Sequence, residues 1–350
     1  MCSSDLPMQK SDIHLLLKEL CCAAGVNGLS DIQTVACDWL KKLADDVRVD
    51  VSGNVLATLP CGKEKAKRVL LEAHMDEIGF VVTGFTDGGF VRVAPCGGID
   101  LRCIAAAPVK IFGKETVNGV FCAVPPHLRG DDDGKKCAPA DKLFVDVGMK
   151  DPESLIAVGD RVSFMPCYAT LSDTAVTAKA LDDRAGMAAV LYALSLLQER
   201  DLPCDVEALF ACGEELGSRG ATPAAFAVDA DAAVITDVSF AFTPDAPRES
   251  CGDLGKGAMI GFSPILNGQF SKRLMQYAKD NGIAFQTEVM GGKTGTDADA
   301  VTIAGNGTPS ALISIPQRYM HTPIEVVDVR DVAAVGTLMA AFITEEMYGI

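Results

Sequence analysis

The stretch that decides the fold is "RAGMAAVLYALSLLQERDLPCDVEALFACGEELGSRG", residues 184–220. Its first part, 184–200, predicts a long helix, and the apolar run 205–211 is typical of a buried strand. Two glutamates, Glu214 and Glu215, follow at the point where this strand should end. An unpaired carboxylate beside a core pays a desolvation cost or shifts its pKa. The two side chains therefore need a partner.

Outward from this stretch, predicted helices and strands alternate along the chain. The expected helices are 271–282, 297–305 and 329–347, and the expected strands are 232–238, 284–289 and 310–316. Strands that alternate with helices indicate a sheet covered on both faces. We therefore predict an α/β fold with a mixed, mostly parallel sheet flanked by helices.

Residues 77–167 differ in character from the rest of the chain. Short β-rich runs such as "FVRVAP", "PVKIFG" and "RVSFMP" are separated there by Gly, Pro and Asp, and no long amphipathic helix interrupts them. We predict that this segment is a small, β-barrel-like inserted domain. Residues 1–76 and 168–350 would then form one discontinuous catalytic α/β domain.

Composition excludes several classes of protein. Of the 350 residues, 49% are hydrophobic, which is enough for a sizeable core, and the formal net charge is -16. Nucleic acids and anionic membranes need a basic surface, so neither is expected as a partner. The 13 cysteines form no regular framework and predict reduced thiols. No apolar run reaches the ~20 residues of a membrane span, and we expect a cytoplasmic protein.

Polar side chains interrupt the expected strand ends. In "HMD", His74 and Asp76 would face the same way on a strand, so the carboxylate could fix the imidazole tautomer. Asp182 or Asp183 in "KALDDRAG" could simply cap the helix that follows. Asp237 in "VITDVSF" could be a cap or turn residue, and His321 in "QRYMHTP" could belong to a turn. Each residue taken alone leaves a structural role open.

Taken as a set, these residues indicate a metal centre. The ends of parallel strands converge on one crevice, so residues far apart in sequence can meet there. The candidate ligands are His74, Asp182, Glu215, Asp237 and His321. All are zinc ligand types, and five of them suit two divalent metal ions better than one.

Two neighbouring cations need a bridging carboxylate, and Asp182 is the natural candidate. We expect His74 and Asp237 to bind one cation and Glu215 and His321 to bind the other. Zinc is the expected metal, with cobalt and manganese as alternatives.

The remaining glutamate, Glu214, would stay free of metal beside the activated water and act as a general base. Neighbours on a regular strand point in opposite directions, so Glu214 and Glu215 can serve one site only after the strand has ended. Gly213 and Gly217 permit that turn. A glycosidase pair is the other explanation, but its carboxylates flank a sugar from opposite sides, which sequence neighbours fit poorly.

Seven motifs in order resemble those of the dinuclear-zinc aminopeptidases that assemble as hollow tetrahedral dodecamers, a family of glutamyl, leucyl and lysyl aminopeptidases. The motifs are "EAHMDEIGF", "GVFCAVPPHL", "KALDDRAG", "GEELGSRGA", "ITDVS", "GTDADA" and "IPQRYMHTP". The resemblance implies a zinc-exopeptidase-like fold and the same five metal ligands, with Asp182 bridging. It also implies Glu214 as the base and Asp76 as the residue that orients His74.

The resemblance has further implications and two departures. It implies a cis peptide between Asp182 and Asp183, and it identifies the inserted domain as a dimerisation domain that helps to build a homododecamer. Cys212 and Gly213 before the glutamate pair depart from the family pattern, and so do Lys293 and Thr294 in the loop "EVMGGKTGTDADA". The role of Cys212 and the preferred N-terminal residue therefore stay open.

The predicted function is metal-dependent release of N-terminal residues from peptides. The alternatives are another metallohydrolase on the same scaffold (a deacylase or carboxypeptidase), a glycan hydrolase, or a binding scaffold without catalysis. A scaffold would not need five ligands and a base, which weighs against the last of these.

Overall fold

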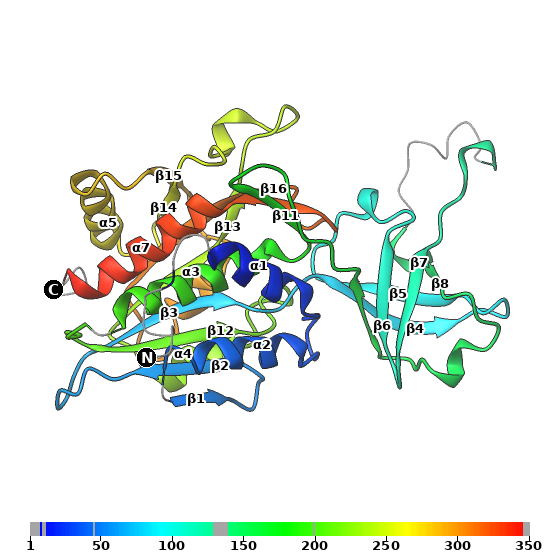
Figure 1. The fold of residues 1–350 in the computed structure, drawn as a ribbon, viewed down its shortest axis with the longest axis horizontal. Helices are drawn as coiled ribbons and strands as arrows, with labels where there is room; N and C mark the ends of the chain where they lie inside the picture. Colours follow the sequence, from blue (N-terminus) through cyan, green and yellow to red (C-terminus); the bar gives the residue numbers. More distant parts are fainter. Residues whose placement is uncertain (1–7, 9–11, 45, 129–138, 199, 346–350) are drawn as a thin grey trace.

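The structure is a computed structural model that describes residues 8, 12–44, 46–128, 139–198 and 200–345. The chain forms a large part, in which helices pack on a central sheet, and a β-barrel that projects from one end of it (Figure 1). No helix in the described ranges is long and apolar enough to cross a membrane.

The large part is built on a mixed sheet with 11 strands among the described residues. In spatial order these are β1 (Asp46–Val49), β2 (Val55–Leu59), β12 (Asp205–Ala211), β3 (Arg68–His74), β13 (Ala232–Phe240), β16 (Ser310–Arg318), β17 (Glu325–Asp328), β11 (Ala175–Ala178) and β10 (Ala169–Thr170), with β14 (Ala258–Phe262) beside β16 and β15 (Phe285–Val289) beside β14. The central strands β12, β3, β13 and β16 run parallel. The predicted α/β fold is confirmed, and its carboxyl strand ends meet at one edge.

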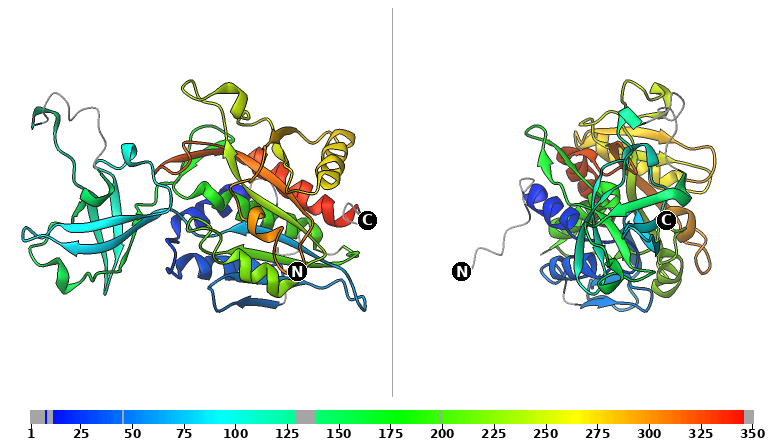
Figure 2. Two further views of the ribbon diagram at one scale, coloured as in Figure 1. Left: turned by 180° about the vertical axis from the view of Figure 1, so that it is seen from behind. Right: turned by 90° about the vertical axis from the view of Figure 1, so that its right-hand side faces the viewer.

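Helices cover both faces of this sheet (Figure 2). One face carries α1 (Asp12–Cys22), α2 (Asp31–Leu40), α3 (Leu181–Leu197), α5 (Gly268–Asp280) and α7 (Val329–Thr344), and the other carries α4 (Ala221–Val228) and α6 (Ala298–Val301). α3 is buried along almost its whole length because it lies between the sheet and the helices α1 and α7. Its first residues therefore stand in the interior, at the carboxyl edge of the sheet.

The projecting part is a closed six-stranded barrel within the described residues. Its strands, in order around the barrel, are β4 (Gly79–Phe85), β5 (Val91–Cys96), β8 (Leu143–Asp146), β7 (Thr116–Phe121), β6 (Pro108–Phe112) and β9 (Arg161–Phe164). The barrel has a core of its own, in which the rings of Phe80 and Phe164 pack edge to face. All six strands lie within the segment 77–167, so the predicted β-barrel-like insertion is present.

Short turns of 3-10 helix connect these elements. They are η1 (Leu101–Cys103), η2 (Pro126–Leu128), η4 (Ala140–Lys142), η5 (Pro152–Ser154) and η6 (Arg248–Ser250).

Some elements differ from the sequence prediction. The helix expected over 297–305 is only the short α6, and Gly305 and Gly307 after it take a positive φ, which helical residues do not. α2 and α4 were not predicted. α2 buries only Ile32, Ala36 and Leu40, and so narrow an apolar stripe is a weak signal.

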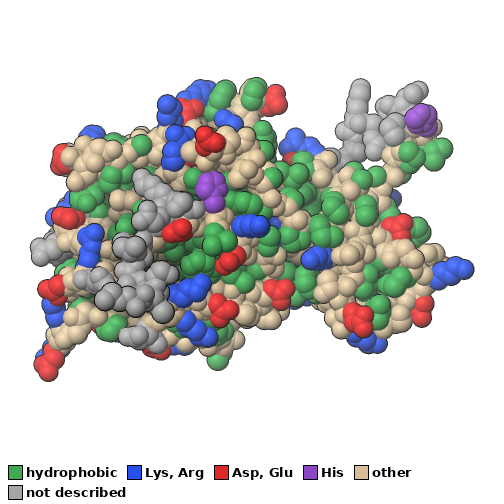
Figure 3. All heavy atoms as spheres, viewed as in Figure 1, with side chains coloured by type: hydrophobic (Ala, Val, Ile, Leu, Met, Phe, Trp, Pro, Cys, Tyr) green, Lys and Arg blue, Asp and Glu red, His purple; other side chains and the backbone are tan. Residues whose placement is uncertain are grey.

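The surface charges and the described cysteines can be followed in the structure. Acidic and basic side chains are interspersed over the face shown in Figure 3, without one large basic patch. No disulfide joins the cysteines of the described ranges.

Candidate metal centre

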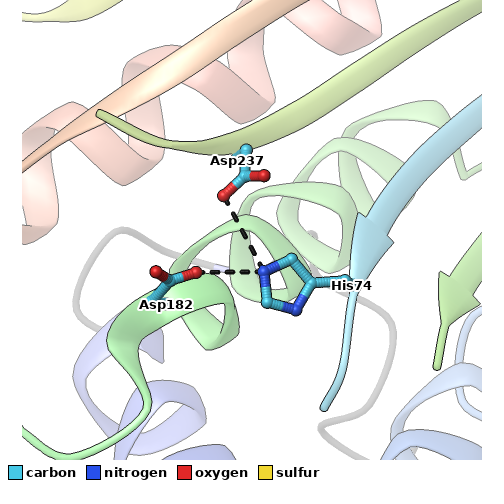
Figure 4. A group of neighbouring side chains, drawn as sticks. All are labelled: His74, Asp182 and Asp237. Atoms are coloured by element: carbon cyan, nitrogen blue, oxygen red, sulfur yellow. Dashed lines mark hydrogen bonds and ion pairs between the residues drawn. The ribbon is translucent and has the colours of Figure 1, made fainter. Parts of the chain in front are cut away.

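Three of the predicted ligands meet at the carboxyl edge of the sheet. His74 ends β3, Asp237 lies in the last part of β13, and Asp182 stands at the start of α3 (Figure 4). His74 Nε2 is 3.0 Å from Asp182 Oδ1 and 3.8 Å from Asp237 Oδ1. All three side chains are buried, and one ligand atom from each lies within 4.8 Å of the others. We call these residues the buried group.

Asp182 also belongs to a second group of potential ligands, with Glu215 and His321. His321 Nε2 is 3.4 Å from Asp182 Oδ2 and 3.5 Å from Glu215 Oε1. This group is more open, because the His321 side chain is 33% exposed. We call it the open group. The structure thus brings together all five residues proposed from the sequence, in the two sets expected.

The local backbone turns Asp182 toward both groups. Its Oδ1 faces His74 and its Oδ2 faces His321, the arrangement of a carboxylate that can bridge two cations. The peptide between Asp182 and Asp183 is cis, as the resemblance implied. Asp183 takes the capping role that the sequence left open for both aspartates, since its Oδ1 accepts a hydrogen bond from the Gly186 N–H at 2.8 Å.

The glutamate pair follows the end of β12 and lies in a turn, in which the Gly217 N–H donates to the Glu214 carbonyl. Gly213 and Gly217 have φ of 74° and 93°, values that favour glycine. Glu214 belongs to neither ligand group, lines the cavity at the centre, and donates its N–H to Asp76 Oδ1 at 3.0 Å. The predicted turn is therefore present.

Asp76 also lies beside the imidazole of His74. His74 Nδ1 is 3.2 Å from the Asp76 carbonyl oxygen and 3.7 Å from Asp76 Oδ1. The nearer partner is thus the backbone carbonyl, whereas the carboxylate holds the Glu214 backbone. Asp76 links the end of β3 to the turn that carries Glu214.

Sequence reasoning missed Glu325, a buried residue of β17. Its Oε2 accepts a hydrogen bond from the Asp182 N–H and its Oε1 accepts one from the His321 N–H, each at 3.0 Å. One carboxylate therefore joins the backbones of two ligands that are distant in sequence. A lone acid in the apolar run "PIEVV" is the signal that could have indicated it.

A loop after the barrel strand β5 also contacts the open group. The Gly98 carbonyl oxygen is 2.8 Å from His321 Nδ1, and the Asp100 N–H donates to the His321 carbonyl at 3.0 Å. A Cβ on Gly98 would come within 2.9 Å of His321 Nδ1. The inserted segment therefore helps to position a residue of the centre.

The electrostatics of the centre favour a cation. Burial, and then the charge of Asp182, raise the pKa of Glu215 to about 8. The hydrogen bond to Asp182 raises the pKa of His321 to about 9, against the opposing effect of burial. Burial raises the pKa of Glu214 to about 7, although the charge of His74 opposes this. Carboxyl groups crowded at this depth retain protons, and a divalent cation could take their place.

One buried atom supports the same conclusion. Glu215 Oε1 has no hydrogen-bond partner among the described residues, although it faces His321 and its side chain is only 5% exposed. A buried carboxylate oxygen of this kind needs a partner, and carboxylate with imidazole is a donor set that zinc accepts. The residues present therefore fit a divalent metal.

The cavity at the centre has a volume of about 290 Å³. Besides residues of both groups, its lining includes Glu214, Phe240, Glu288, Met290, Leu312 and Ser314. Thr294, which departs from the family pattern, also lines the cavity.

Cys212 lies apart from the ligands. Its Sγ donates to the Ser52 carbonyl at 2.8 Å, and burial raises the pKa of the thiol to about 11. It belongs to neither ligand group. Cys212 is therefore a packed thiol with a hydrogen bond of its own.

Comparison with known proteins identifies the family. The sequence profile of M42 glutamyl aminopeptidase matches residues 53–338. The chain belongs to this family. A lysyl aminopeptidase from Pyrococcus furiosus is 34% identical over 339 residues, which span 94% of this chain and 96% of that protein.

Solved structures of peptidases have the same fold as this chain. An aminopeptidase from the archaeon Desulfurococcus kamchatkensis superposes with a TM-score of 0.89 at 31% identity, covering 97% of each chain. The TET1 peptidase of Pyrococcus horikoshii, which can assemble into a tetrahedron or a large octahedral shell, superposes with a TM-score of 0.84 at 30% identity, over 95% of this chain and 99% of that one.

The M42 protein described here is thus an aminopeptidase, a hydrolase that depends on divalent metal for the cleavage of N-terminal peptide bonds. The resemblance carried by the seven motifs is confirmed. Family membership favours this activity over the deacylase, glycan hydrolase and scaffold alternatives.

Proposed function

We propose that the enzyme binds two divalent cations, zinc in preference to cobalt or manganese. His74 and Asp237 would hold one, Glu215 and His321 the other, and Asp182 would bridge them. The observation that carries the proposal is the position of the Asp182 carboxylate, which turns one oxygen to each histidine.

The bound cations would supply the Lewis acidity that polarises a scissile carbonyl and activates water. Glu214 would take a proton from the water and deliver it to the leaving amine. Its backbone is fixed by Asp76 and its side chain lines the cavity, as a proton carrier requires. The acidic lining would also attract the free α-ammonium of a peptide, which favours cleavage at the N-terminus.

The variant Glu214→Gln tests this assignment. Loss of the base should lower kcat by roughly 10²- to 10⁴-fold, whereas elemental analysis should still find two metal ions per subunit. Glu215→Gln is the matched neighbour, and it should lose metal from the open group. Equal metal loss in both variants would contradict the role of Glu214 as a base.

A pair of substrates tests the exopeptidase reaction itself. An aminoacyl 4-nitroanilide with a free amino group should be cleaved, and the same compound with an acetylated amino group should not. Cleavage of the blocked compound at an equal rate would indicate an endopeptidase or a deacylase.

We also propose that residues 77–167 form a separate domain through which the protein self-associates, first as a dimer and then as a dodecamer, while residues 1–76 and 168–350 form the catalytic domain. The separate core of the barrel and the assembly described for the TET1 peptidase support this proposal. Leu128 near the barrel is 77% exposed, and Leu128→Glu should reduce the mass measured by light scattering. Val51→Glu, at an exposed site on the large part, is the control.

A further inference from the structure

A buried ion pair lies where the barrel joins the large part, and the proposed mechanism does not use it. Lys179 Nζ is 2.6 Å from Glu77 Oε2, and each of the two side chains is only 1% exposed. Among the Lys and Arg ion pairs of the described residues, this is the one with both partners buried. Two buried charges lose their hydration, so such a pair persists only with good geometry and further hydrogen bonds.

Those further hydrogen bonds come from three parts of the chain. Glu77 Oε1 accepts from the Gly25 N–H at 2.7 Å and from the hydroxyl of Ser163, on β9, at 3.1 Å. Lys179 Nζ also donates to the Ala23 carbonyl, just after α1, at 3.1 Å. The ion pair therefore holds the segment after α1, the residue that follows β11 and the last strand of the barrel at one point.

A second buried cation lies near the same carboxylate. Arg184 of α3 is fully buried, and its guanidinium nitrogens have no hydrogen-bond partner among the described residues. The guanidinium takes the space that a side chain at Gly25 would need, because a Cβ there would clash with Arg184 Nη2. Burial lowers the pKa of Arg184, and the charge of Glu77 is the largest effect that opposes this. Glu77 thus compensates two buried cations.

The start of β4 connects Glu77 to the loop that contacts His321. Gly79, two residues after Glu77, pairs with Cys96 of β5, and Gly98 follows Cys96 by two residues. The Gly98 carbonyl oxygen is 2.8 Å from His321 Nδ1. A short path of paired strand therefore leads from the buried ion pair to a ligand of the open group.

Close packing at the start of β4 leaves this path little room to shift. A Cβ on Gly79 would lie 2.7 Å from the Val162 carbonyl oxygen of β9 and would clash with the Val26 side chain. Arg161, at the start of β9, donates to the Asn27 carbonyl at 2.7 Å. The segment after α1 therefore holds both the first and the last strand of the barrel, and a packed chain of contacts of this kind can carry energetic coupling.

We propose that Glu77, through its pair with Lys179, is a positioning residue that holds the barrel against the central sheet and so keeps the Gly98 carbonyl on His321. Glu77 belongs to neither ligand group and does not line the cavity of the centre. The inference rests on the proposed two-cation function for its readout in metal binding. Loss of the pair lets the barrel loop move away from His321, which weakens the open group.

Two variants separate positioning from simple stability. Glu77→Gln leaves Lys179 buried without its charge partner, so the melting temperature should fall. The double variant Glu77→Gln/Lys179→Met removes both charges and should regain most of this loss, because uncharged side chains of similar volume can replace a buried pair. In both variants the open group should bind zinc roughly tenfold more weakly, and the buried group should change by less than about threefold. Asp253→Asn, which breaks an exposed ion pair with Arg248, is the control.

Hydrogen exchange gives a readout that needs no metal. The Asp100 N–H donates to the His321 carbonyl at 3.0 Å. In the double variant, exchange in the peptide 97–103 should be roughly tenfold faster, because the loop opens more often. Exchange in β6 and β7, on the far side of the barrel sheet from this loop in strand order, should stay as in the unaltered protein.

The outcomes separate this inference from the proposed function. If the unaltered protein binds fewer than two cations per subunit, the proposed function fails, and exchange in 97–103 alone decides the inference. If the double variant has the zinc affinity and the exchange of the unaltered protein, Glu77 serves stability only and the inference fails.

Ser163→Ala provides the test if these variants do not fold, because it keeps both charges and removes only the hydrogen bond from β9. It should weaken the open group by roughly threefold and speed exchange in 97–103 by a similar factor. Unchanged affinity and exchange in this variant would overturn the inference.

Discussion

The buried group and the open group share Asp182 but are built in different ways. In the buried group, His74 and Asp237 come from adjacent parallel strands, β3 and β13, and both side chains are almost inaccessible. In the open group, Glu215 lies in a turn and His321 has a φ of 61°, which few residues other than glycine adopt. The first set is fixed by strand pairing. The second depends on contacts from elsewhere in the molecule.

Those contacts come from separate regions. The Glu325 carboxylate of β17 accepts a hydrogen bond from the backbone N–H of His321. The carbonyl oxygen of Gly98, in the loop after β5, accepts one from the His321 imidazole. Groups that orient a metal-binding histidine commonly alter metal affinity by roughly 10- to 100-fold. We therefore expect the open group to bind its cation more weakly than the buried group does.

The largest effect should follow the loss of the shared residue. Asp182→Ala removes an oxygen from both groups, so elemental analysis should find neither cation. Activity should fall by roughly 10³-fold or more, because the metals contribute several kcal/mol to the transition state. The exposed Asp173→Asn is the control. Retention of one full equivalent of metal would show that the two groups do not depend on Asp182 equally.

Metal affinity should rise with pH. Without metal, Glu215 has a pKa of about 8 and His321 a pKa of about 9, so both keep their protons at lower pH. A cation has to displace these protons, which weakens its binding by about tenfold per pH unit for each proton released. Titration with zinc from pH 6 to 9 should show tighter binding as pH rises. A constant affinity over this range would contradict the protonation described.

Glu325→Gln should sharpen the difference between the groups. The amide turns one acceptor into a donor that faces an N–H, either at Asp182 or at His321. We expect the affinity of the open group for its cation to fall by roughly 10- to 100-fold, because two of its ligands, Asp182 and His321, are held by Glu325. The affinity of the buried group should fall less, because it shares only Asp182. Equal weakening of both, together with a lower melting temperature, would mean that Glu325 only stabilises the fold.

The smallest effect should come from Gly98→Ala. The added methyl group would lie 2.9 Å from His321 Nδ1, so the loop or the imidazole has to shift by a few tenths of an ångström. KM and the affinity of the open group should change by roughly three- to tenfold, at the lower limit of such effects. Gly84→Ala, where an added Cβ meets nothing within 4 Å, is the control. An unchanged affinity would exclude a role for the barrel loop in holding His321.

The sequence predicted more of the buried group than of what surrounds the open group. Alternation of helix and strand placed His74 and Asp237 at the ends of parallel strands, and such ends meet at one edge. The sequence could not predict that Glu325 joins Asp182 to His321, because a lone acid in an apolar strand has many structural explanations. The Gly98 contact depends on how the barrel sits against the sheet, which no local pattern encodes.

The sequence by itself determined the α/β fold, the β-rich insertion, the five candidate ligands and the separation of Glu214 from Glu215. These features depend on local periodicity, on turn residues and on the side-chain chemistry of zinc. Only the tertiary structure decided which carboxylate joins the two groups, which loop holds His321, and that Glu288 shares their cavity. Those relations depend on strand register and on packing between distant segments, which no local pattern in the sequence encodes.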